Sequence, residues 1–95
     1  MSIDELREEI DRLDTRLLEI FNRRASLALQ IGEIKKEKGL PVYDPRREKI
    51  IFERMKRENP GPLDDQAIVR LFERVVDESR RLERIMTARK EENQC

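Results

Sequence analysis

The stretch IFNRRASLALQIGEIKK, from Ile20 to Lys36, decides the fold that we predict for this chain. It lies within a segment, residues 4–38, that contains no proline and a single glycine, Gly32. Apolar residues recur along it at alternating steps of three and four, apart from one gap of seven, which is the spacing of one face of an α-helix. They are Ile3, Leu6, Ile10, Leu13, Leu17, Ile20, Leu27, Ile31 and Ile34. The pattern predicts one long amphipathic helix over 4–38.

Two segments interrupt the helical pattern, GLPVYDP and NPGPLDD, and both contain proline and glycine, which predicts loops. A second helix is predicted over 44–58, because Asp44 can cap it and Pro45 suits its first position. A third helix is predicted over 64–90. Few aromatic residues and only three glycines argue against a sheet. We therefore predict an all-α fold in a single domain, residues 1–95.

The length of the first helix bears on the assembly. About 35 residues at ~1.5 Å rise per residue span roughly 50 Å. A compact chain of this size has a radius of gyration of only about 12 Å. The other two helices cannot cover so long an apolar stripe, so we expect an intertwined homodimer in which a second copy covers it. A three-helix monomer is the alternative.

The composition excludes several classes of function. Lysine plus arginine and aspartate plus glutamate number 21 each, so no net charge attracts nucleic acid or a membrane surface. There is no histidine, and the one cysteine is the last residue, Cys95, which we expect to be an incidental thiol. The usual metal ligand sets, Cys–His nucleophiles and disulfides are thereby excluded. No signal core or membrane-spanning run is visible. We expect a cytoplasmic protein that needs no metal or cofactor.

Two cations lie on the inner side of the first helix. Arg24 fills a gap of seven in the apolar spacing, so its guanidinium projects among aliphatic residues, where an unpaired charge is costly. It is either paired inside the bundle or placed to meet an anionic ligand. Lys35 lies about 16 Å further along the helix, beyond the small residues Ala28 and Gly32. Together they form a candidate cradle for a small dianion. Alternatively, Lys35 reaches solvent and the small residues allow close packing.

The other two helices also carry polar residues on or beside their apolar faces. Ser79 and Glu83 share one face of the third helix, since they lie four residues apart. A buried glutamate is usually paired or protonated, although a surface position for Glu83 remains open. Arg47 and Glu48 lie at the edge of the second helix's apolar face, where ordinary surface charge is the alternative. The inward candidates for acid–base chemistry are Glu83, Lys35 and Glu48, and no activated nucleophile is visible.

Taken together, these positions resemble the all-α (AroQ-class) chorismate mutases. The segments LREEIDRLD, NRRASLALQIGEIKK, PVYDPRREKIIFERM and RLFERVVDESRRLE carry the resemblance over nearly the whole chain. It implies a domain-swapped dimer with two active sites that converts chorismate to prephenate, toward phenylalanine and tyrosine. That reaction is an intramolecular [3,3] rearrangement, which requires a compact substrate conformer and stabilisation of charge on the breaking ether oxygen. Fixed cations supply both, without a nucleophile, metal or cofactor.

The resemblance also implies roles for the cations. By matching position, Arg24 binds one substrate carboxylate, and Arg7 of the partner chain binds the other. Arg7 lies about 25 Å from Arg24 along the helix, too far for both to meet one small ligand in the same chain. Lys35 is expected to contact the ether oxygen and a carboxylate.

Further roles follow from the same resemblance for residues of the second and third helices. Glu48 is expected to bind the ring hydroxyl of the substrate. Arg47 and Asp44 are expected to line or order the site. Ser79 is expected to contact a carboxylate or its surroundings.

Glu83 departs from the commonest family pattern, in which many members carry glutamine and some carry glutamate. The side chain at this position should donate a hydrogen bond to the ether oxygen, and an ionised carboxylate cannot donate. Burial raises the pKa of such a group, whereas a nearby Lys35 lowers it. We expect activity to be highest at mildly acidic pH and to decline as Glu83 ionises, and we expect Glu83→Gln to flatten this profile.

Two other functions fit the same residues. An isochorismate–pyruvate lyase shares the fold and the cationic cradle, although DPRRE, with Glu48 available for the hydroxyl, favours the mutase. A non-catalytic helical dimerisation or regulatory module is the third possibility. The chain looks free-standing or excised from a fusion, and without an added regulatory domain we expect no feedback control by aromatic amino acids.

Overall fold

The computed structural model describes the backbone of residues 1–93 and the side chains of residues 1–88. It contains three helices, α1 (Ile3–Glu37), α2 (Pro45–Glu58) and α3 (Asp65–Asn93), and no strand within the described residues. The predicted all-α class with a very long first helix is confirmed. The expectation for Cys95 lies outside the described residues. No helix in the described part of the chain is long and apolar enough to cross a membrane.

The helices begin where side chains satisfy their first backbone N–H groups. Ser2 caps α1 in a reciprocal arrangement with Glu5, whose backbone N–H donates to the Ser2 hydroxyl at 3.1 Å. Asp44 caps α2, since its carboxylate accepts the Arg47 backbone N–H at 3.1 Å, and Pro45 occupies the first position. The predicted start of the second helix is therefore observed, and its cap fixes the loop that enters it.

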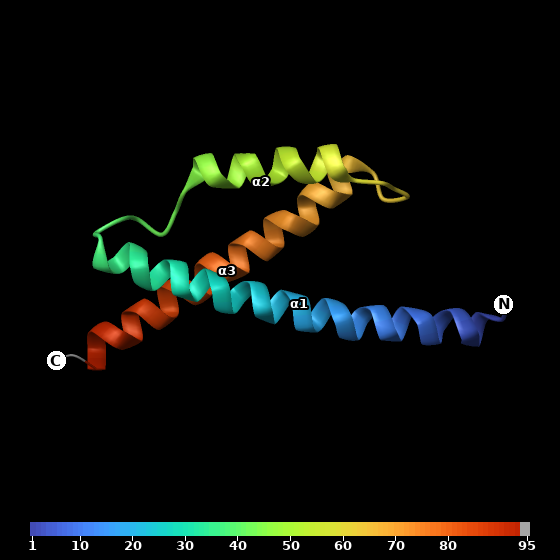
Figure 1. The fold of residues 1–95 in the computed structure, drawn as a ribbon, viewed down its shortest axis with the longest axis horizontal. Coiled ribbons are helices and arrows are strands. Elements are labelled where there is room, and N and C mark those ends of the chain that lie inside the picture. Colours follow the sequence, from blue (N-terminus) through green and yellow to red (C-terminus); the bar gives the residue numbers. More distant parts are fainter. Residues whose placement is uncertain (94–95) are drawn as a thin grey trace.

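The arrangement is open and elongated (Figure 1). The chain measures 59 × 28 × 15 Å, with a radius of gyration of 16.9 Å. Both α1 and α2 pack against α3, and α1 crosses α3 in the C-terminal half of α1. Helices α2 and α3 diverge from the loop that joins them (Figure 1). Side chains from the C-terminal part of α1, from α2 and from the middle of α3 line one common cavity.

The N-terminal half of α1 extends beyond the other helices (Figure 1). Its apolar stripe is exposed along its whole length, from Leu6 at 44% to Ile10 at 53% and Leu13 at 55%. Among the apolar side chains of residues 1–88, the buried ones are Ile51 and Val76, at 6% and 8% exposure. One chain therefore leaves uncovered the stripe that we expected a second copy to cover, and the homodimer itself stays a prediction.

Candidate active site

The space between the three helices is a cavity of about 250 Å³. Residues of all three helices and of the loop between α1 and α2 line it. Seven of the eight residues predicted for the site lie around it, namely Arg24, Lys35, Asp44, Arg47, Glu48, Ser79 and Glu83. These residues span 60 positions of sequence, and the crossing of α1 over α3 brings them together.

Arg24 is half-buried, and its partner in the cavity is neutral. Its Nη1 donates to the Ser79 hydroxyl at 3.1 Å, which joins α1 to α3. Burial lowers the pKa of Arg24, and the guanidinium groups of Arg47 and Arg54 lower it further, against an opposing effect of Glu83. The cations around Arg24 thus outweigh the nearby negative charge, and an anionic ligand would relieve this imbalance.

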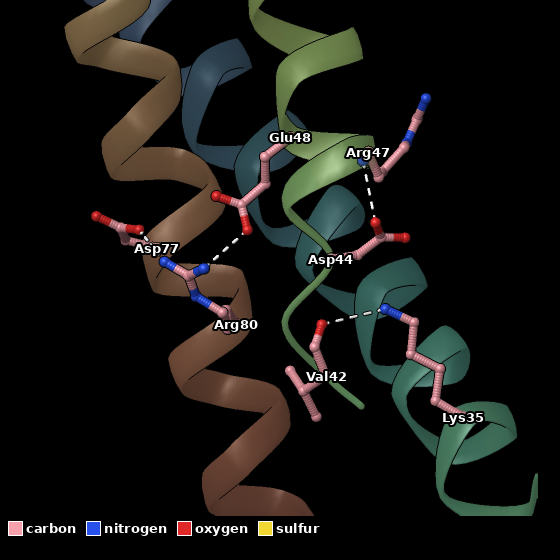
Figure 2. A network of polar contacts seen from close by, with 7 residues as sticks. All are labelled: Lys35, Val42, Asp44, Arg47, Glu48, Asp77 and Arg80. Carbon is pink, nitrogen blue, oxygen red and sulfur yellow. Dashed lines mark hydrogen bonds and ion pairs between the residues drawn. The ribbon is translucent and has the colours of Figure 1, made fainter. Parts of the chain in front are cut away.

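Lys35 reaches inward along the loop. The sequence had left open whether its side chain points into the bundle or to solvent. Its Nζ donates to the Val42 carbonyl at 3.1 Å, and the side chain is half-buried (Figure 2). An ammonium carries three donors, so this bond leaves capacity for a ligand oxygen. Lys35 and Arg24 both line the cavity from α1, where they lie eleven residues apart.

The start of α2 supplies the remaining polar groups on that side. Asp44 is occupied as the helix cap, and both Asp44 and Arg47 are exposed. Glu48 is half-buried and turns toward α3, away from the Arg47 guanidinium (Figure 2). Asp44 thus orders the loop, while Glu48 is the acceptor that faces the interior.

Sequence reasoning missed Arg80, which holds Glu48. Arg80 Nη1 donates to Glu48 Oε2 at 2.7 Å, and its guanidinium carbon lies 4.8 Å from the centre of the Tyr43 ring. Arg80 follows Ser79 directly in a run with several arginines, and Asp77 three residues earlier suggests an ordinary surface pair. No signal in the sequence separates Arg80 from its neighbours, because the partner is on another helix.

Glu83 is the one charged side chain that is buried among residues 1–88, at 7% exposure. Burial raises the pKa of Glu83, while the positive charges of Lys35, Arg24 and Arg80 oppose that rise. A β-carbon placed on Gly32 would lie 3.1 Å from the Glu83 Cγ, so α1 and α3 meet closely here. The structure thus places Glu83 inward, packed on Gly32, where burial shifts its pKa upward.

Arg7 is the predicted site residue that the single chain keeps away from the cavity. It is exposed near the start of α1, and 17 residues of helix separate it from Arg24, or about 25 Å. A contribution of Arg7 to a site would have to come from another chain.

The type II chorismate mutase family profile matches residues 6–84, which include most of α1, all of α2, the first two thirds of α3 and every residue that lines the cavity. The chain belongs to this family. The resemblance found from the sequence is thereby confirmed. A chorismate mutase structure from Thermus thermophilus (form II) superposes with a TM-score of 0.85 at 39% identity, over 86% of this chain and 93% of that one.

A second chorismate mutase structure, from Helicobacter pylori, was determined in complex with prephenate. It superposes with a TM-score of 0.80 at 32% identity, over 86% of this chain and 89% of that one. A bifunctional chorismate mutase/prephenate dehydratase of Aquifex aeolicus is 40% identical over 86 residues, which are 86% of this chain. The chain spans only 24% of that bifunctional protein's length.

Proposed function

We propose that this chain catalyses the rearrangement of chorismate to prephenate. In this step the ether C–O bond breaks as a C–C bond forms, within one molecule. The observation that carries the proposal is the single cavity in which Arg24, Lys35 and the buried Glu83 meet. The excess of positive charge near Arg24 suits a substrate with two carboxylates.

The cations act by holding the substrate and by stabilising charge. Arg24, steadied by Ser79, binds one carboxylate. Lys35, steadied by the Val42 carbonyl, binds the ether oxygen and a carboxylate. Holding the two reacting ends together removes the conformational entropy of a flexible dianion before reaction. Donors already fixed toward the ether oxygen stabilise its developing negative charge.

Glu83 acts as the second donor to the ether oxygen, in its protonated form. Its burial between α1 and α3 favours that form, because a carboxylate without water around it is costly. When Glu83 ionises, the donor is lost and a negative charge faces the oxygen. The rate should therefore fall as pH rises through the raised pKa of Glu83.

The ring hydroxyl of chorismate is bound by Glu48. That carboxylate faces the interior from the first turn of α2, which the Asp44 cap holds in place. Arg47 is exposed at the cavity rim, where it adds to the positive field around the entering dianion. The hydroxyl, the ether oxygen and the carboxylates of the substrate thus each have an assigned partner.

The complete site is a property of a domain-swapped homodimer, in which Arg7 of one chain reaches the second carboxylate in the other chain's cavity. The exposed apolar stripe of α1 supports this assembly, because an uncovered stripe of that length is unfavourable in water. The Aquifex relative's name joins the mutase to a prephenate dehydratase, which fits a place for this reaction on the route toward phenylalanine and tyrosine. The cytoplasmic location expected from the sequence stays a prediction.

The test is chorismate consumption by the purified protein near pH 5 and near pH 8, with identification of the product. Prephenate, formed faster at the lower pH, would support both the cation cradle and the protonated Glu83. Prephenate with no such trend would keep the activity and remove the role of Glu83. Release of pyruvate from isochorismate in place of prephenate formation would show the lyase, and no turnover of either substrate would contradict the proposal.

A further inference from the structure

Arg80 links α3 to α2 and to the loop before α2, at one edge of the cavity. Its Nη2 donates to Asp77 Oδ1 at 2.5 Å on its own helix, and its Nη1 donates to Glu48 Oε2 at 2.7 Å on α2. Its guanidinium also lies over the ring of Tyr43, in the loop that leads into α2, at 4.8 Å. Arg80 thus ties the start of α2 and the loop before it to α3.

The two carboxylates that Arg80 binds differ in exposure. The side chains of Arg80 and Glu48 are 21% and 18% exposed, whereas Asp77 is 55% exposed. Water therefore screens the bond to Asp77 more strongly than the bond to Glu48. Because a guanidinium is a rigid planar fork, the Asp77 bond and the Tyr43 ring orient the prong that meets Glu48.

Arg80 engages only one oxygen of Glu48. The bond goes to Oε2, and Oε1 receives no hydrogen bond from any residue that the structure describes. Oε1 can therefore accept a hydrogen bond from a ligand without breaking the ion pair. Arg80 pairs with two carboxylates, but Asp77 is the more exposed one, so the positive charge of Arg80 offsets mainly the negative charge of Glu48.

We propose that Arg80 is a positioning and specificity-determining residue. It aims Glu48 Oε1 at the ring hydroxyl, and it offsets part of the negative charge of Glu48, so that a neutral donor is preferred over a cationic one. This inference rests on the proposed function. An ammonium group gains most from a carboxylate whose charge is unbalanced, while a hydroxyl needs an acceptor in the right place. Removing Arg80 should therefore lower kcat/KM less for a substrate with an ammonium group than for a substrate with a hydroxyl group.

The experiment compares chorismate with its 4-amino-4-deoxy analogue, in which an amine replaces the ring hydroxyl. Both are assayed with the wild type, Arg80→Gln, Glu48→Gln and the double variant. Arg84→Gln is the matched control, since it removes an exposed arginine one turn further along α3. Arg80→Lys restores the charge without the fork, and thermal unfolding of each variant reports folding.

The expected result is a loss of about tenfold in kcat/KM for chorismate in Arg80→Gln, or about 1.4 kcal/mol. The loss in kcat/KM for the amino analogue should be several-fold smaller, so the ratio of kcat/KM for chorismate to kcat/KM for the analogue falls. In the Glu48→Gln background, Arg80→Gln should change kcat/KM for chorismate less than about twofold, because the partner is already gone. Arg80→Lys should recover the ratio in part, and Arg84→Gln should match the wild type.

Equal losses on both substrates, or equal losses with and without Glu48, would overturn the inference and leave Arg80 a structural residue. If Arg80→Gln does not fold, an Arg80→Lys variant with an unchanged ratio and unchanged kcat/KM would overturn it equally. A wild-type chain that folds but does not convert chorismate would overturn the proposed function, and this inference with it. If the wild type converts chorismate normally and Arg80→Gln leaves kcat/KM for both substrates unchanged, the inference alone is overturned.

Discussion

Gly32→Ala places a methyl group where α1 and α3 come closest at the site. The added β-carbon would lie 3.1 Å from the Glu83 Cγ, 3.4 Å from its Cβ and 3.5 Å from its Cδ. Ordinary contacts between such atoms begin near 3.4 Å, so the Glu83 side chain has to move by a few tenths of an ångström. The carboxyl group moves with it, away from the position from which it donates to the ether oxygen.

The expected magnitudes follow from this displacement. A misplacement of about 1 Å can cost on the order of a hundredfold in rate, so a few tenths of an ångström should cost roughly three- to tenfold in kcat/KM. Alanine is about 1 kcal/mol more favourable than glycine within a helix. Overpacking costs typically 1–3 kcal/mol, or about 1 here because a flexible side chain can yield. The free energy of unfolding should therefore change by less than about 1 kcal/mol.

The assay pairs chorismate kinetics near pH 5 with urea unfolding. As a control, the same substitution is made in a Glu83→Ala background, which lacks the Cγ at 3.1 Å and the Cδ at 3.5 Å and keeps only the Cβ at 3.4 Å, an ordinary contact distance. There, Gly32→Ala should stabilise the chain by about 1 kcal/mol, because only the helix preference remains. Full wild-type kcat/KM in Gly32→Ala, or the same stability change in both backgrounds, would refute the close contact as the reason for glycine at this position.

Three further predictions concern pH, assembly and the α2 cap. Glu83 has a raised folded-state pKa, so the folded chain holds the proton more tightly than the unfolded chain. Stability should therefore fall as pH rises from the unfolded pKa of about 4.3 through the folded value. Glu83→Gln should abolish this fall in urea titrations and flatten the pH profile of kcat/KM, and an unchanged profile would exclude the donor role. Arg7→Ala and Arg24→Ala should each be nearly inactive, but co-refolding them should recover about a quarter of wild-type turnover, since half of randomly formed dimers carry one intact site; no recovery would contradict the shared site. Asp44→Ala should cost about 1 kcal/mol in urea unfolding through loss of the cap, and a stability equal to the wild type would contradict it.

The helices themselves were determined by local features of the sequence. Apolar spacing, the prolines and glycines of the two loops and the caps at Ser2 and Asp44 act over a few residues, so they can be read without a fold. The same periodicity places Arg24 and Glu83 on the inward faces of their helices. A second copy was expected from length alone, and the exposed stripe of α1 agrees with that expectation without testing it.

The pairing of side chains between helices was decided by tertiary structure alone. Arg80 and Arg81 are equivalent in sequence, yet the direction in which α2 leaves α3 gives Arg80 the Glu48 carboxylate and leaves Arg81 69% exposed. Gly32 could be taken as a packing residue, but its contact with Glu83 depends on where α1 crosses α3. Periodicity states which face of a helix is buried. It carries no information on crossing angle or register, and these decide which side chain each buried group meets.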